Sequence, residues 1–387
     1  MSPLGNISIE EFLQEYWQKK PLLVRNAFPD FTSPIDPDDM AGLSLMEEVE
    51  SRIILENKKD KSWQVQHGPF NDDTFATLPE QDWTLLVQAV DQWVPEMADL
   101  MNQFNFIPNW RLDDMMASFA PKGGSVGPHF DHYDVFLIQG LGQRSWQVGP
   151  KCDESSPFLN DVPVKILKKM QVTHEWTLNP GDMLYLPPAY AHNGVALNDA
   201  MTFSVGFRAP SEADILMGLS EHLAQRLNND KRYSDPQPSN ASKQPSLINA
   251  DAIAKVSEII NQHIQKEGAI EQWLAQYMTE SKYEGLHEPL EDPLEWDELG
   301  PLLTTESQLV KNETSRWAYY LIDGKIVLVI NAEKVEFSLS KQSQELATIL
   351  ANNRYINYES IAELLKQAEC QDLLLRLING NHLYFEE

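Results

Sequence analysis

Two short segments, one holding a His-x-Asp pair and the other a single histidine, constrain the fold of this chain more than any other feature. The first is residues 127–134, in which His129 and Asp131 stand two positions apart. Side chains on a β-strand alternate between its faces, so a strand here would project the imidazole and the carboxylate side by side. The second is residues 180–192, where a Pro-Gly-Asp turn and a short apolar strand precede His192. The length of chain between the two segments suits a small β-barrel that brings them together.

Two histidines and one aspartate are the ligand set of the facial triad, which holds Fe(II) in non-haem oxygenases and leaves coordination positions open for a cosubstrate and O2. Iron is favoured over zinc because no cysteine joins the set. A His-x-Asp pair alone occurs often by chance, and a lone His or Asp is usually structural or solvated. The conjunction with the later turn, strand and histidine favours the metal site. His174 and Glu175 form a poorer cluster, because neighbouring side chains on a strand face opposite ways. Four isolated histidines are interpreted as structural or solvated: His222, His263, His287 and His382.

Arg144 lies on the strand that is predicted after a Gly-Leu-Gly turn, and it shares one face with Trp146 and Val148. An arginine on an apolar face suits a cation that lines the interior of a barrel. An oxygenase that uses 2-oxoglutarate needs such a cation, because the planar guanidinium binds the distal carboxylate of that cosubstrate through two hydrogen bonds. The alternative is an arginine on a solvent-exposed edge strand, since this residue type is mostly exposed.

These segments, together with residues 16–23 and 203–210, resemble those of the JmjC-type cupin oxygenases. More closely, they resemble the bacterial ribosomal oxygenases, which hydroxylate C3 of an arginine in a large-subunit ribosomal protein. The resemblance extends over essentially the whole chain, and residues 12–210 match the oxygenase domain. It implies a mainly β fold with helical additions, built on a double-stranded β-helix, the jelly roll of the cupin and JmjC proteins. It also implies Fe(II), 2-oxoglutarate and O2.

The resemblance carries over to individual positions. The residues that match the iron ligands and the 2-oxoglutarate-binding arginine are His129, Asp131, His192 and Arg144. The residues that match the substrate pocket are Asp114, Met116, Tyr133 and Ser204. A carboxylate and a hydroxyl can hold a guanidinium, while methionine and tyrosine pack along its aliphatic stem. The alternatives are that Met116 is a core residue and that Asp114 is a solvated acid. Lys122 and Ser125 stand in a turn where more glycine or proline is expected.

Composition narrows the cellular setting. The chain has 387 residues with 42% hydrophobic side chains, which is enough for at least two domains with buried cores. Only two cysteines occur, which fits a reducing compartment. No run resembles a membrane span or a secretion signal, so we expect a cytoplasmic protein. The net charge of −28 disfavours binding to phosphate backbones and suits a basic partner such as a ribosomal protein, although many enzymes are acidic merely for solubility.

Changes in residue pattern along the chain, together with the resemblance, predict three parts. They are a JmjC/cupin oxygenase domain at 1–210, a helical region with linkers at 211–300, and a winged-helix-like domain at 301–387. In the first part, residues 82–100 are predicted to form a helix rich in Trp and Leu. In the second part, apolar residues recur at helical spacing at 212–227, 250–266 and 269–281. These helices have no obvious core of their own, so we expect a homodimer interface here, as the resemblance also implies. Packing within the domain is the alternative.

The last part predicts two strands around an Asp-Gly turn, 316–322 and 325–330, followed by three short helices and a closing strand. This order resembles a winged helix. Residues 300–387 hold 8 Lys and Arg against 12 Asp and Glu, without a basic stripe. We therefore expect a protein-binding or structural role, with no direct binding of nucleic acid.

Other functions remain open at this point. A 2-oxoglutarate oxygenase could act on a different residue, as a histidine hydroxylase or a lysine demethylase, because demethylation begins with the same hydroxylation of a carbon. A metal-binding cupin without oxidative activity would fail a 2-oxoglutarate turnover assay. A winged-helix regulator that uses the cupin as a sensor would bind DNA in a sequence-specific, salt-dependent manner.

Overall fold

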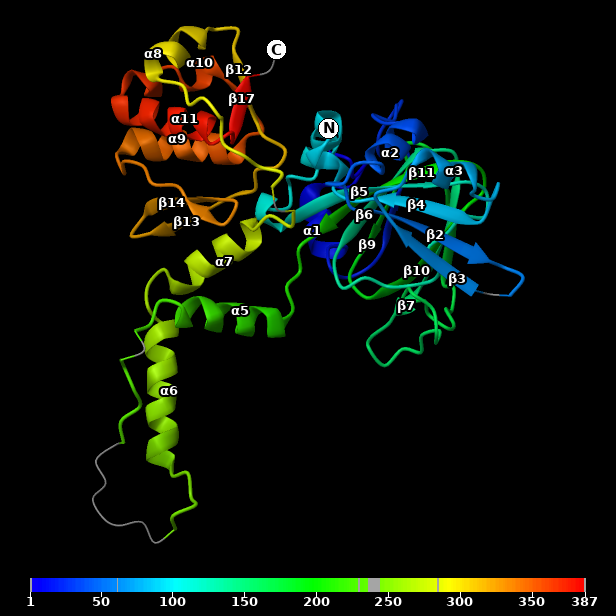
Figure 1. The fold of residues 1–387 in the computed structure, drawn as a ribbon, viewed down its shortest axis with the longest axis horizontal. Coiled ribbons are helices and arrows are strands. Elements are labelled where there is room, and N and C mark those ends of the chain that lie inside the picture. The colour runs from blue at the N-terminus through cyan, green and yellow to red at the C-terminus, as the bar shows by residue number, and fades with distance from the viewer. Residues whose placement is uncertain (1, 61, 229, 236–243, 284, 386–387) are drawn as a thin grey trace. The chain divides into compact units, whose positions relative to one another are not determined.

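The computed structural model describes residues 2–60, 62–228, 230–235, 244–283 and 285–385 (Figure 1). The chain divides into two compact units, Met1–Ala209 and Pro210–Glu387. Whether the helices after residue 210 form a domain separate from the winged-helix-like part stays a prediction.

The first unit is built on two antiparallel sheets. The larger sheet has the order β1 (Leu22–Val24), β9 (Met183–Leu186), β6 (Val135–Leu141), β11 (Ala200–Phe207), β5 (Leu112–Ala120), β4 (Trp83–Val87), β2 (Ser51–Asn57) and β3 (Ser62–His67). The smaller sheet has the order β10 (Tyr190–Ala196), β7 (Arg144–Lys151) and β8 (His174–Leu178). Some neighbouring strands, such as β9 and β6 or β11 and β5, are distant in sequence, as in a jelly roll. The predicted mainly β, cupin-type fold is confirmed.

Strands of the larger sheet alternate between two cores. On one face, the main core takes Phe136 and Ile138 of β6 together with Phe203 and Val205 of β11. The other residues of β6 and β9 meet the smaller sheet in a second core: Val135, Leu137, Leu184 and Leu186 pack with Trp146, Val148 and Leu178. Because β5 sends Met115 and Ala117 to the main core, its alternate positions 114, 116 and 118 lie on the face toward the smaller sheet. The barrel interior is therefore where the predicted substrate residues belong.

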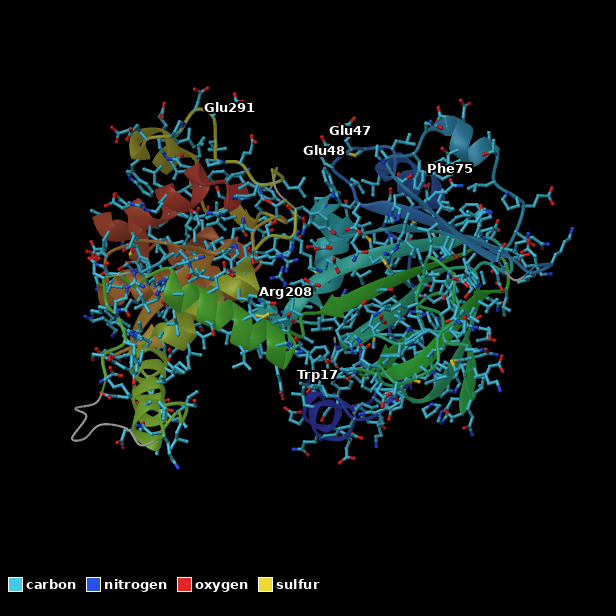
Figure 2. The ribbon with its side chains drawn as sticks, turned by 60° about the horizontal axis from the view of Figure 1, so that its bottom comes forward. Trp17, Glu47, Glu48, Phe75, Arg208 and Glu291 are labelled. Carbon is cyan, nitrogen blue, oxygen red and sulfur yellow. The ribbon has the colours of Figure 1, made fainter. Side chains whose placement is uncertain are left out.

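Short helices cover the main core. They are α1 (Ile9–Glu15), α2 (Pro37–Leu43), α3 (Asp72–Ala76), η1 (Val90–Gln92), α4 (Pro95–Asn102) and η2 (Asn109–Arg111). The first helix begins at Ser8, whose side chain accepts the Glu11 N–H, and it buries Phe12 completely. Trp17, which follows the helix and is labelled in Figure 2, stacks on Tyr185 with ring centroids 5.7 Å apart. Aromatic packing thus fixes the N-terminal segment to β9, and burying one such ring contributes about 2 kcal/mol.

The helix predicted at 82–100 is wrong over its first half. Residues Trp83–Val87 form β4, which pairs with β2 on one side and β5 on the other. All five residues are buried, and all but Thr84 are apolar, so this central strand lacks the alternation that marks a half-exposed strand. Such a run cannot be told from a buried helix by periodicity. A helix, α4, occurs only at Pro95–Asn102, where Pro95 suits the first turn.

The second unit begins with three helices: α5 (Glu212–Ala224), α6 (Ala250–Ile264) and α7 (Ala269–Thr279). Their predicted positions are confirmed. A capping box at Ser211 and Asp214 opens α5, and Gly268, with a φ of 75°, allows the turn between α6 and α7. Within the described ranges, no helix has both the length and the hydropathy needed to cross a membrane.

The remainder of this unit combines short helices with two small sheets. The helices are α8 (Trp296–Leu299), η3 (Gly300–Leu302), α9 (Lys341–Asn352), α10 (Tyr358–Ile361), η4 (Leu364–Lys366) and α11 (Ala368–Asn379). One sheet joins β16 (Tyr355–Asn357), β12 (Gln308–Lys311) and β17 (Leu383–Phe385), and the other joins β13 (Trp317–Ile322), β14 (Lys325–Ile330) and β15 (Glu333–Lys334). The hairpin turn at Asp323 and Gly324 has positive φ at both positions, as predicted.

Candidate active site

The segment that carries His129 and Asp131 is an extended connection between β5 and β6, so its prediction as a strand is wrong. Gly127 has a φ of 82°, and Pro128 has no N–H to give to a ladder. One antiparallel bridge joins the segment to β10: the His129 N–H donates to the His192 carbonyl at 2.9 Å, and the reverse bond is 2.8 Å. The Ala189 N–H also donates to the Asp131 carbonyl, at 2.7 Å. These bonds place the segment beside His192 without a regular strand.

The three predicted metal ligands come together. One ligand atom from each of His129, Asp131 and His192 lies within 4.8 Å of the others. Asp131 Oδ2 is 4.0 Å from His129 Nε2 and 3.5 Å from His192 Nε2. Ligand atoms on one face of an octahedral ion are about 3 Å apart for bonds of about 2.1 Å. Across the described parts of the chain, no other trio of His, Cys, Asp or Glu side chains meets in this way.

Backbone carbonyls orient both imidazoles. His129 Nδ1 is 2.8 Å from the Gly127 carbonyl, and His192 Nδ1 is 2.9 Å from the Tyr190 carbonyl. A carbonyl can only accept, so each Nδ1 carries the proton and each Nε2 presents its lone pair to the centre. Burial, together with the nearby His129 ring, lowers the pKa of His192 to about 4. This histidine is therefore neutral at physiological pH, as a metal ligand must be.

Arg144 is buried in the barrel interior without an acceptor for two of its donors. The side chain is 3% exposed, and no residue that the structure describes accepts from its Nε or its second terminal nitrogen. Trp146 and Val148 on the same face of β7 are also buried, as the alternation predicted. Burial lowers the pKa of the guanidinium to about 10, so Arg144 is still charged at neutral pH. An uncompensated buried charge is costly, and an anion is what it lacks.

The predicted substrate residues line the same interior. Asp114 is 4% exposed, and Gln88 Nε2 donates to its Oδ2 at 2.9 Å. Met116 of β5 lies directly opposite Ser204 of β11, so both share the face that Asp114 occupies. The alternative of a solvated Asp114 is therefore wrong.

Tyr133 stands on the segment between the metal pair and β6. The residue is 42% exposed, but its hydroxyl lies among carboxylates. Burial of that end, followed by the charges of Asp131 and Asp114, raises the pKa of the hydroxyl. It therefore stays protonated and can donate. The Tyr133 hydroxyl therefore lies near Asp131 of the metal group and near Asp114 of the predicted substrate pocket.

Several residues that support the site were missed from the sequence. Gln88 holds Asp114, and it follows the strand that was predicted as a helix. Asp134 is fully buried and accepts hydrogen bonds from Tyr185 at 2.6 Å and from Gln18 at 3.1 Å. Asp134 and Tyr185 lie inside the two segments that were singled out. Their identity as a buried acid and a tyrosine within apolar strands was the available signal.

Comparison with known proteins bears on this geometry. A model described as the JmjC domain matches residues 99–215, and one described as the ROXA-like winged helix matches residues 262–384. The chain is 35% identical to the ribosomal protein uL16 3-hydroxylase of Escherichia coli over 383 residues, which covers 97% of each chain. The chain belongs to the bacterial ribosomal oxygenases.

Other members of this family agree. This chain is 45% identical to a probable ribosomal oxygenase of Haemophilus influenzae over 217 residues, which cover 56% of this chain and 53% of that relative. A solved structure of the Escherichia coli ribosomal oxygenase YcfD, in complex with cobalt and 2-oxoglutarate, has a TM-score of 0.86 with 34% sequence identity over 99% of each chain. The predicted winged-helix resemblance of the C-terminal part is confirmed.

The site of this ribosomal oxygenase fits the groups that the family uses. Two imidazoles and one carboxylate are the donor set of a non-haem iron site, and the buried guanidinium of Arg144, which lacks an acidic partner among the described residues, suits a dicarboxylate cosubstrate.

Proposed function

We propose that this ribosomal oxygenase hydroxylates C3 of an arginine in the large-subunit ribosomal protein uL16. It is a JmjC ribosomal protein hydroxylase that depends on Fe(II) and 2-oxoglutarate. The observation that carries the chemistry is the buried, unpaired guanidinium of Arg144 on the interior face of the barrel whose mouth holds the His-Asp-His group. Support for the substrate comes from the name of the Escherichia coli relative and from a buried carboxylate, Asp114, that can receive a cation.

Metal, cosubstrate and residues have distinct roles. Fe(II) on His129, Asp131 and His192, with 2-oxoglutarate and O2, supplies the oxidant for a substrate C–H bond, while the cosubstrate becomes succinate and CO2. Arg144 binds the distal carboxylate of the cosubstrate and thereby orients its other end toward the metal. The apolar core between the sheets, which includes Leu137, keeps water away from this ion pair and strengthens it.

The target side chain is held by groups of matching chemistry. Asp114 pairs with the guanidinium, and Ser204 adds a hydroxyl that can accept from it. Met116 and Tyr133 pack along the methylene stem, which places C3 rather than the guanidinium carbon near the metal. Gln88 keeps the Asp114 carboxylate in one orientation through its amide N–H.

The substrate class is tested with peptides. Succinate formation should rise on addition of a peptide from uL16 that contains the target arginine, and it should not rise with the same peptide in which lysine or histidine replaces that arginine. Asp131→Ala should abolish turnover. Equal stimulation by the lysine peptide would instead favour a lysine-directed oxygenase.

We further propose a cytoplasmic homodimer whose winged helix binds protein rather than nucleic acid. The dimer is supported by α6, which has no buried residue although Ile253, Val256 and Ile260 repeat at helical spacing and are 57%, 47% and 52% exposed. A second copy of the chain is the partner that an apolar stripe of this length suits. The acidic charge of the C-terminal residues opposes contact with phosphates.

A further inference from the structure

We propose that Ser125 is a positioning residue that ties together the two segments carrying the metal ligands, and so determines how tightly the site binds its metal. This inference rests on the proposed metal site. It concerns a residue that touches neither metal nor substrate. Ser125 also stands where the resemblance leads one to expect glycine or proline.

The Ser125 hydroxyl is buried and fully used. The side chain is 3% exposed. Its Oγ accepts the Gly127 N–H at 3.0 Å and donates to the Asn193 side-chain oxygen at 2.9 Å. One hydroxyl thus bonds to a residue on each of two segments that are 68 positions apart in the chain. A buried hydroxyl with both roles satisfied holds its partners in one geometry.

Each partner of Ser125 lies within two residues of a metal ligand. Gly127 donates its N–H to the Ser125 hydroxyl, and its carbonyl is 2.8 Å from His129 Nδ1, so the residue that the hydroxyl holds also orients the first imidazole. Asn193 follows His192 directly in β10. The amide N–H of Asn193 continues the network to Gln147 Oε1 at 3.5 Å, on the neighbouring strand β7. The hydroxyl therefore couples the position of one imidazole to the strand that bears the other.

This tie matters because the segment before β6 has little regular structure to hold it. It meets β10 through the bridge between His129 and His192 and through backbone hydrogen bonds of Gly123 and Gly124 with Ala196, and the Asp131 carbonyl accepts the Ala189 N–H just before β10. A loose ligand segment costs metal affinity, since the ligands must be ordered when the metal binds. Groups that orient metal ligands typically change affinity by about 10- to 100-fold when they are removed.

The alternative is that Ser125 only stabilises the fold, and a matched control separates the two roles. Ser118 is 4% exposed and its hydroxyl donates to the Thr202 carbonyl at 3.2 Å, but it bonds to neither ligand segment. Ser125→Ala and Ser118→Ala thus remove a comparable buried hydroxyl from the same domain. The thermal unfolding midpoint of the metal-free protein reports the structural effect of each.

The experiment is a titration of metal-free full-length protein with Co(II), followed by the visible absorption of the bound ion. Ser125→Ala should raise the Co(II) dissociation constant by about 10-fold or more, while Ser118→Ala should change it by less than about twofold. Equal affinity of Ser125→Ala and unmodified protein, or an equal loss in both variants, would overturn the inference.

A double-variant cycle gives a second, independent readout. Asn193→Ala removes the acceptor of the same hydrogen bond, so the combined Ser125→Ala/Asn193→Ala protein should lose less affinity than the product of the two single losses. Strictly multiplicative losses would contradict the tie. If the unmodified protein binds Co(II) no better than His192→Ala does, the metal site and this inference both fall; a change confined to the Ser125 variants bears on the inference alone.

Discussion

At the scale of single residues, the site depends on a charge that the protein buries without an anion beside it. Within the described ranges, no group accepts from two of the donors of Arg144, whereas the amide of Gln88 holds Asp114 in the barrel interior. A buried guanidinium of this kind costs free energy in the empty protein and regains it when an anionic ligand binds. Arg144 therefore serves binding and does not stabilise the fold.

This leads to opposite expected effects of Arg144→Met on binding and on stability. The KM for 2-oxoglutarate should rise about 100-fold, because a charge-assisted bidentate pair in a buried site is lost. The metal-free protein should be as stable as the unmodified one or more stable, by about 1 kcal/mol, because a buried charge is removed. Initial-rate kinetics and urea denaturation measure the two effects, and a strongly destabilised variant with normal KM would contradict them.

Asp114→Asn should separate substrate binding from cosubstrate chemistry. The amide keeps the shape of the side chain but loses the charge that pairs with the target guanidinium, so kcat/KM for the peptide should fall by about 100-fold or more. Turnover of 2-oxoglutarate without peptide should stay near its normal rate.

Asp113→Asn is the matched control, because Asp113 pairs with Arg208 at 2.9 Å, at the point where β11 ends (Figure 2). It should alter stability more than peptide specificity. If both variants lose peptide turnover to the same extent, Asp114 has no special role.

At this scale, the sequence predicted the residues of the metal and cosubstrate sites, where several residue types of distinctive chemistry occur together. His129, Asp131, His192 and Arg144 could be named in advance because few other roles bring these residue types together. Gln88 and Ser125 could not, since a single amide or hydroxyl has no distinctive pattern until its partners are known in space.

At the scale of elements, alternation along the strands predicted more than propensity did. It placed Arg144, Trp146 and Val148 on one buried face of β7, and the structure agrees. The same reasoning failed at residues 83–87, where a helix was predicted, because a central strand covered on both faces shows no alternation. The metal pair was placed on a strand, whereas a positive φ at Gly127 and one backbone bridge produce the required geometry.

An acid-sensitive pair, His287 and His382, lies in the C-terminal part, and His382 directly precedes the last strand, β17. The rings of His287 and His382 stack at 4.6 Å with an angle of 7° between them. Burial, and then the neighbouring His287, lowers the pKa of His382 to about 4. The folded state thus favours the neutral ring, while the unfolded chain takes up a proton near its ordinary pKa of about 6.5.

The stability from this pair is present above about pH 6.5 and is lost as the pH falls toward 4. Between about pH 7 and pH 5, protonation of His382 should reduce the free energy of unfolding by up to about 2 kcal/mol. His382→Phe keeps an aromatic ring in the stack but binds no proton, so its urea-denaturation midpoints should depend less on pH. An unchanged pH dependence would show that another group is responsible.

At the scale of the whole molecule, the proposal of a dimer assigns the exposed stripe of α6 to a second copy. Ile253→Glu combined with Ile260→Glu would place charges in that stripe, so the molar mass by light scattering should fall from that of a dimer to that of a monomer. Lys255→Glu is the control, since its side chain pairs with Glu258 at 3.0 Å on the same helix. A monomeric unmodified protein, or a dimer that survives the double change, would contradict the assignment.

Charge also acts on the whole molecule. With a net charge of −28, the enzyme attracts a basic ribosomal protein over a range that salt shortens, to about 8 Å at physiological ionic strength. Encounter with the substrate therefore depends on the sum of many carboxylates, whereas the proposed selection of one arginine would depend on the few groups inside the barrel.

The measurement that tests the central claim most directly is mass spectrometry of uL16 after incubation with the enzyme, Fe(II) and 2-oxoglutarate in air. The expected result is a gain of one oxygen atom on one arginine, located at C3 by fragmentation and amino-acid analysis, and absent with His192→Ala. Unmodified uL16 alongside continued consumption of 2-oxoglutarate would contradict the assigned substrate while leaving the oxygenase chemistry in place.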